Sequence, residues 1–202
     1  MKKSVLSLVL IICIIAGCLV GCKDKASNES YDETTINVDK NGKITETIVD
    51  SFDKEYYNID ELRNAFNAEI DQYNAIVGRS AAELKDIKIE NNNVYVSVSF
   101  EDMKAYKAIQ NKEFFFGTIK EAYEAGYRFD ITMKGVENGD RIEKVQIMGM
   151  SDKHIVIFNE VARISTYRPI IYVSANVDVL KDKTARSSSE SGSGLCYIVL
   201  DK

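Results

Sequence analysis

The amino-acid sequence predicts an α+β fold in which antiparallel hairpins pack with a few amphipathic helices and the C-terminal part is rich in strands. Short runs in which apolar residues alternate with polar ones, separated by turn residues, predict the hairpins. Segments with apolar residues at helical spacing, each behind a capping residue, predict the helices. The chain has 202 residues, of which 45% are hydrophobic and 1 is proline, as expected for a globular protein and not for a low-complexity or disordered chain.

The body of the protein begins with a predicted hairpin. Residues 34–38 and 44–49 are rich in β-formers and flank Asn41-Gly42, a dipeptide typical of tight hairpin turns. A calcium loop is the other candidate for this turn, and the spacing of its residues excludes it. The EF-hand spacing needs a ligand at position 5 and glycine at 6, whereas here Gly42 falls at 4 and Lys43 at 5.

A long amphipathic helix is expected over residues 60–76. Asn58 followed by Glu61 resembles a capping box at its start, and Gly78 follows its end. The apolar positions of this segment recur every three or four residues: Leu62, Ala65, Phe66, Ile70, Tyr73 and Val77. This stripe indicates a helix that packs on a sheet.

A second hairpin and two short helices follow. Residues 84–90 and 94–100 are predicted strands, and the strict alternation of the second implies one buried face. One helix is expected over 101–110 with Asp102 as its cap. Another is expected over 118–126, which opens with a capping-box pattern and ends at a glycine.

The C-terminal part is predicted to consist of strands. They are expected at 129–133, 142–148, 154–158, 161–165, 170–179 and 195–200. The serine-rich run 187–194 indicates a flexible loop before the last strand. The body, residues 34–202, is either one unit or two lobes that divide near 127–135.

The N-terminus has the pattern of an export signal. Lys2 and Lys3 precede an apolar stretch over residues 4–22, which contains Gly17 and Gly21 near its far end. A helix that spans the membrane is the alternative, because about 20 apolar residues cross the hydrocarbon core. The two glycines favour a processed signal peptide.

Residues 19–22 read Leu-Val-Gly-Cys and resemble the lipobox of bacterial type II signal peptides. The resemblance implies a signal peptide over 1–21, cleavage before Cys22 and acylation of its sulfur by a diacylglyceryl group, with palmitate-type chains. Residues 15–18 form a second match directly before it, which makes Cys18 the alternative lipidated residue. Leucine three positions before the cysteine and the polar residues after it favour Cys22.

The lipid predicts where the protein is found. Two acyl chains on one residue hold a protein at a bilayer, so we expect it on the extracytoplasmic face of the cell membrane. Residues 22–33 comprise the lipidated cysteine and a polar, flexible tether. After cleavage Cys196 is the remaining thiol, and its apolar surroundings predict a buried strand cysteine.

Two parts of the body carry a further resemblance. Residues 52–57 with 61–62, and 115–119 running to 125–127, look like segments of small uncharacterised extracytoplasmic lipoproteins of Gram-positive gut bacteria. The likeness extends over most of residues 34–202. It implies an extracytoplasmic location and an α+β body, and it transfers no catalytic residues.

The composition excludes several function classes. A net charge of −5 and a pI near 5.1 leave no footprint for nucleic acid. His154 is the one histidine, so we expect no catalytic histidine, no metal site and no cofactor. Acidic pairs such as Asp50 and Asp53 are too frequent to be specific, and we predict no catalytic residue. The aromatic runs Tyr56-Tyr57 and 114–116 either line a groove or pack in the core, and core packing is favoured.

These observations favour a non-enzymatic binding or interaction module whose ligand is a protein, a peptide or a cell-wall component. The alternative is a carboxylate-dependent hydrolase of the cell envelope, which would use two of the 31 acidic residues.

Overall fold

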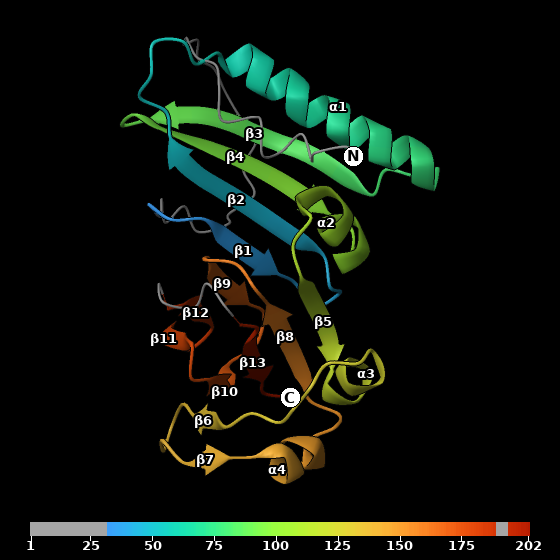
Figure 1. Cartoon of the computed structure of the whole chain (residues 1–202), viewed down its shortest axis with the longest axis vertical. Helices are drawn as coiled ribbons and strands as arrows, with labels where there is room; N and C mark the ends of the chain where they lie inside the picture. Colours follow the sequence, from blue (N-terminus) through green and yellow to red (C-terminus); the bar gives the residue numbers. More distant parts are fainter. Residues whose placement is uncertain (1–31, 189–193) are drawn as a thin grey trace.

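Figure 1 shows the computed structural model of the chain, which describes residues 32–188 and 194–202. The predicted α+β fold is confirmed. The helices in the described residues are α1 (Ile59–Val77), α2 (Met103–Gln110), α3 (Ile119–Glu124) and α4 (Lys144–Gly149). The strands there are β1 (Thr35–Val38), β2 (Ile44–Ser51), β3 (Ala82–Glu90), β4 (Asn93–Phe100), β5 (Phe114–Thr118), β6 (Met133–Gly135), β7 (Arg141–Ile142), β8 (His154–Phe158), β9 (Arg163–Thr166), β10 (Ile170–Ser174), β11 (Val177–Lys181), β12 (Thr184–Ser187) and β13 (Cys196–Leu200).

The strands form two sheets. The first sheet has the order β11-β12-β9-β1-β2-β4-β3, and the second has the order β5-β8-β13-β10-β6-β7. Among the pairings of the described strands β1 with β9 is parallel and the others are antiparallel. Strands from before and after residues 127–135 therefore share the first sheet. A division into two lobes at that range stays a prediction.

The second sheet lies between two apolar clusters. In β8, Val156 and Phe158 join a cluster that also contains one face of the first sheet and residues of α1 and α2. Ile155 and Ile157 point the other way, into a cluster with α3 and α4. Both faces of β8 are thus covered, which explains why its sequence is a continuous apolar run.

The first hairpin and the long helix form as predicted. β1 and β2 pair antiparallel, and Gly42 takes the left-handed φ of +80° that the turn needs. The side chain of Asn58 accepts hydrogen bonds from two backbone N–H groups of the first turn of α1, and Gly78 ends the helix with a φ of +68°. Leu62, Phe66 and Ile70 are its buried residues.

The caps of the two short helices are confirmed as well. Asp102 accepts hydrogen bonds from the backbone N–H groups of Lys104 and Ala105 at 3.0 and 2.9 Å, and α2 follows it. Thr118 and Glu121 form the reciprocal capping box that starts α3.

The strand predicted over 94–100 differs from expectation in its burial. Its even-numbered residues face the core as predicted, but Tyr95 and Ser99 on the other face are also buried. The ammonium of Lys88 lies 4.9 Å from the centre of the Tyr95 ring and covers it. The prediction of one buried face was therefore wrong.

Three predicted C-terminal elements also differ. Residues 142–148 are mostly α4, because Glu143 and Gln146 form a capping box that starts a helix there. Residues 129–132 are irregular, and Phe129 is buried without strand pairing. The strand expected over 170–179 is broken into β10 and β11 at residues 175–176.

Several predictions fall outside the described residues. They are the signal peptide 1–21, the lipidated Cys22 or Cys18, most of the tether 22–33 and the middle of the serine-rich run 187–194. Of the tether, Glu33 is described and its carboxylate pairs with the guanidinium of Arg163 on β9. None of the helices in the described residues is long and apolar enough to cross a membrane.

Candidate functional site

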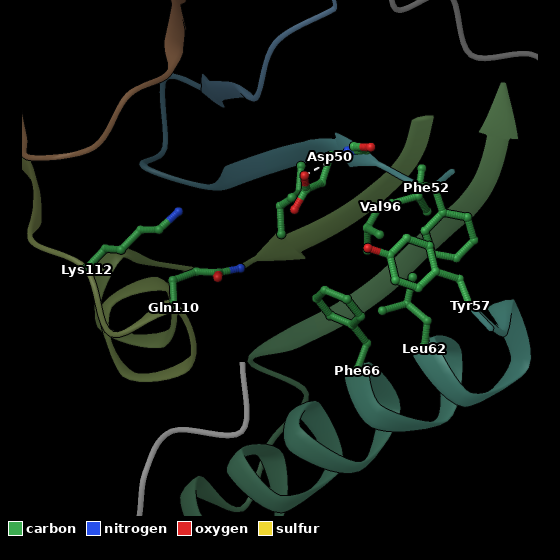
Figure 2. Close-up of a pocket in the computed structure, with 11 residues that line it drawn as sticks. Asp50, Phe52, Tyr57, Leu62, Phe66, Val96, Gln110 and Lys112 are labelled. Atoms are coloured by element: carbon green, nitrogen blue, oxygen red, sulfur yellow. Dashed lines mark hydrogen bonds between the residues drawn. The ribbon is translucent and has the colours of Figure 1, made fainter. Parts of the chain in front are cut away.

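A groove lies over the β2–β4 pair, between α1 and the end of α2, and Figure 2 shows the side chains that line it. Its volume is about 160 Å³. Its walls are largely apolar: Ile48, Phe52, Leu62, Phe66, Val94 and Val96. We call it the α1–β4 groove.

Sheet register and helix periodicity together build the walls. Ile48 on β2 lies directly opposite Val96 on β4, so the two side chains share a face of the sheet. Leu62 and Phe66 are four residues apart on α1 and therefore lie on the same side of the helix, toward the sheet. A sheet face and a helix face thus form two sides of one space.

An aromatic pair closes one end of the groove. The rings of Phe52 and Tyr57 are stacked with their centres 5.1 Å apart, and Tyr56 packs edge-on against Tyr57. In Figure 2 the hydroxyl of Tyr57 is directed toward the interior of the groove. Of the aromatic run 56–57, Tyr57 lines the groove, whereas Tyr56 is exposed.

A buried amide stands at the other end. Gln110 is the last residue of α2, only 4% of it is exposed, and it points from the helix end into the groove (Figure 2). Neither its amide nitrogen nor its amide oxygen has a hydrogen-bond partner among the described residues. Each buried polar group without a partner costs about 1–3 kcal/mol. A ligand whose polar groups hydrogen-bond to the Gln110 amide would remove this cost, so the amide favours the binding of such a ligand here.

Behind this end lies a cluster of four polar side chains, which are buried except for Lys112: Glu46, Tyr106, Lys112 and Glu160. The Tyr106 hydroxyl is 3.3 Å from Oε1 of Glu46, and Nζ of Lys112 is 3.4 Å from the same oxygen. Tyr106 and Lys112 also donate to the two carboxylate oxygens of Glu160. The cluster holds two carboxylates and one cation.

Three residues of the cluster, Glu46, Tyr106 and Lys112, have shifted pKa values. Burial raises the pKa of Glu46 to about 7, the charge of Lys112 opposes this rise, and the charge of Glu160 adds to it. Burial alone would lower the pKa of Lys112, but the two carboxylates outweigh it and raise that pKa. Burial and then the carboxylates raise the pKa of Tyr106. The net effect brings the pKa of Glu46 close to neutral pH.

The cluster connects the two sheets. Glu46 lies on β2 of the first sheet, and Glu160 lies in the link from β8 of the second sheet to β9 of the first. The side chain of Glu46 is 0% exposed, whereas Lys112 is partly exposed and also lines the α1–β4 groove. Lys112 is thus shared between the cluster and the groove.

Of the residues singled out from the sequence, His154 and Cys196 lie outside the groove and the cluster. His154 Nδ1 is 2.6 Å from the hydroxyl of Tyr167, and its ring packs edge-on against Phe116. Cys196 is buried, and its thiol lies 3.6 Å from the carbonyl oxygen of Asn176. Of the two acids named above as a pair, Asp50 lies in the groove lining.

The other acid of the pair, Asp53, and the aromatic run 114–116 lie outside the groove lining. Asp53 pairs with Lys54. Phe114 and Phe115 are buried on β5, as the core-packing alternative expected. In the described part of the chain, no group of three His, Cys, Asp or Glu side chains is placed to hold a metal ion.

Sequence reasoning missed Glu46 and Gln110, although each gives a signal. Glu46 falls between Ile44 and Ile48 on one face of a strand, so a charged residue stands in an apolar row. Gln110 is four residues after Tyr106 and so lies on the same helix face as that buried ring. Polar residues at core-facing positions are the informative exception in such patterns.

Comparisons with protein-family models, with curated proteins and with solved structures found no match to this chain.

Proposed function

We propose that this protein is a binding module, anchored by lipid to the extracytoplasmic face of the cell membrane, that takes its ligand in the α1–β4 groove. The observation that carries the proposal is the Gln110 amide, buried without a partner in a groove with apolar walls. Small binding sites combine an apolar lining with a few polar groups that orient the ligand, and this groove has that composition. The lipobox-like residues 19–22 support the anchor.

A second candidate function is the carboxylate-dependent hydrolase of the cell envelope. Glu46 and Glu160 favour it, because a carboxyl with a pKa of about 7 next to a second acid resembles a general acid with its partner. The burial of Glu46 argues against it, since a general acid must reach the substrate within hydrogen-bond distance. Binding is therefore the better supported function.

Toluene tests whether the apolar part of the groove takes a ligand, because its ring matches the volume of the groove and its apolar walls. In methyl NMR spectra, added toluene should shift the signals of Val94 and Val96 in a saturable way. Ile48→Phe fills the groove and should abolish these shifts. Val49→Phe adds a ring to the opposite face of the same strand and should leave them intact.

Shifts that spread over the protein without saturation, or that persist in Ile48→Phe, would contradict the proposal. Thermal unfolding of both variants checks that each is folded. The hydrolase is tested with purified peptidoglycan. Turnover that Glu160→Gln abolishes, in a variant that unfolds at the wild-type temperature, would replace binding by hydrolysis as the proposed function.

A further inference from the structure

The size of the α1–β4 groove limits what can occupy it. Its volume of about 160 Å³ is close to that of an engineered apolar cavity of ~150 Å³ that holds benzene. Pockets for whole small molecules are larger, roughly 300–1,000 Å³. The groove therefore has room for one aromatic or branched aliphatic side chain, and the rest of the ligand must lie outside it.

The polar end of the groove indicates what that side chain is attached to. The Gln110 amide offers one acceptor oxygen and two N–H donors, and none of these has a partner among the described residues. The N–H and C=O of one residue in an extended chain point to the same side and form the complementary donor and acceptor. One peptide residue would thus satisfy both kinds of group at once.

The charges around the groove disfavour an ionic ligand. Lys112 lines it, but two carboxylates already neutralise its ammonium group. Asp50 is exposed in the groove lining, where it would repel a carboxylate or a phosphate. A fatty acyl chain would fit the walls and would leave the Gln110 amide unpaired.

We infer that the α1–β4 groove holds one apolar side chain of an extended peptide segment of a partner protein, with the Gln110 amide hydrogen-bonded to the peptide groups beside that side chain. This inference rests on the proposed function, since it names the ligand class of the same site.

N-acetyl-L-leucinamide is the test probe, because it joins one apolar side chain to peptide groups on both sides. Four further probes are compared with it, of which two lack one feature each and two represent other classes of ligand. N-acetylglycinamide lacks the side chain, methyl isobutyl ketone lacks the amide, octanoate represents a lipid chain, and N-acetylglucosamine represents a wall sugar. The leucinamide should give saturable shifts of the Val94 and Val96 methyl signals and of the Gln110 side-chain amide signal, with at least tenfold tighter binding than any other probe.

Gln110→Met separates hydrogen bonding from packing, because methionine keeps the length of the side chain and removes the amide. We expect at least tenfold weaker binding of the leucinamide together with an unfolding temperature equal to or above that of the wild type, since an unpartnered buried amide is removed. The matched control is Gln72→Met on the exposed face of α1, which should change neither. Gln110→Leu provides a second variant if the methionine variant does not fold.

Several results would overturn the inference. One is that methyl isobutyl ketone or octanoate binds as tightly as the leucinamide and that Gln110→Met does not weaken binding of the leucinamide. If toluene still binds in that case, the groove remains a binding site and only the peptide ligand is refuted. Tighter binding of N-acetylglucosamine would point to wall glycan instead. Shifts that appear on raising the protein concentration alone would show that a second copy of the chain fills the groove. If toluene also fails to bind, the proposed function falls with the inference.

Discussion

The buried Glu46 should make the stability of this protein fall as the pH rises through neutrality. In the folded chain its pKa is about 7, whereas the ordinary value of 4.5 applies to the unfolded chain. Between these values the folded chain binds more protons than the unfolded chain, so the free energy of unfolding decreases with increasing pH. The stabilising contribution is complete below about pH 4.5 and is lost above about pH 7.

The size of the effect follows from the difference between the two pKa values. Each pKa unit corresponds to about 1.4 kcal/mol, which gives roughly 3 kcal/mol for the whole transition and about 2.5 kcal/mol between pH 5 and pH 8. Lys112 keeps its charge throughout this window, because its pKa is raised above 10.5. A change of this size is a large part of the total stability of most domains, about 5–15 kcal/mol.

Urea unfolding at constant ionic strength measures the effect at pH 5, 6, 7 and 8. Glu46→Gln keeps the shape of the side chain and removes the titrating proton, so its stability should vary little over this range. At pH 8 the variant should be more stable than the wild type. Glu55→Gln, at an exposed position, is the control and should keep the wild-type dependence on pH.

A wild-type stability that stays constant or increases from pH 5 to pH 8 would refute this account of Glu46. The same conclusion would follow if Glu46→Gln kept the wild-type slope. Either result would mean that the cost of burying the carboxylate is offset inside the cluster by Lys112 and Tyr106.

Three further predictions concern other parts of the chain. Mass spectrometry of the protein from cells should find a diacylglyceryl or larger lipid adduct on Cys22 at the mature N-terminus, and an unmodified Cys22 still joined to the signal sequence would contradict the lipobox. A thiol reagent should label the buried Cys196 of the folded protein far more slowly than in urea, and equal rates would disprove its burial. Asp102→Ala removes the cap of α2 and should lower the free energy of unfolding by about 1 kcal/mol, whereas Asp71→Ala on the exposed side of α1 should have a smaller effect, and equal losses would argue against the cap.

Capping residues in the sequence predicted where α1 and α2 begin and where α1 ends, and the structure shows these residues in that role. Asn58 and Gly78 bound α1, and Asp102 starts α2, because each satisfies backbone groups within a few residues of itself. The same local chemistry was misread at residues 142–148. There the turn residues at 138–140 led to the expectation of a strand after them, while Glu143 and Gln146 start a helix.

The candidate site could not be predicted in the same way, because it depends on contacts between distant residues. Lys112 pairs with Glu46 and Glu160, which are 66 and 48 positions away from it. A single carboxylate in a strand gives no indication of which cation or hydroxyl will face it. The sequence places Gln110 on the helix face of Tyr106, but only the folded structure shows that its buried amide has no partner among the described residues.

The parallel pairing of β1 with β9 has a consequence for how the chain acquires its structure. Glu33, just before β1, and Arg163 at the start of β9 are 130 positions apart, yet they form an ion pair. The ribosome synthesises β1 long before β9, so the β9 side of β1 stays unpaired until the C-terminal strands have been made. Contacts between residues so far apart in the sequence slow folding. Late completion of the first sheet would suit the export that residues 19–22 predict, because a translocation channel accepts an unfolded chain.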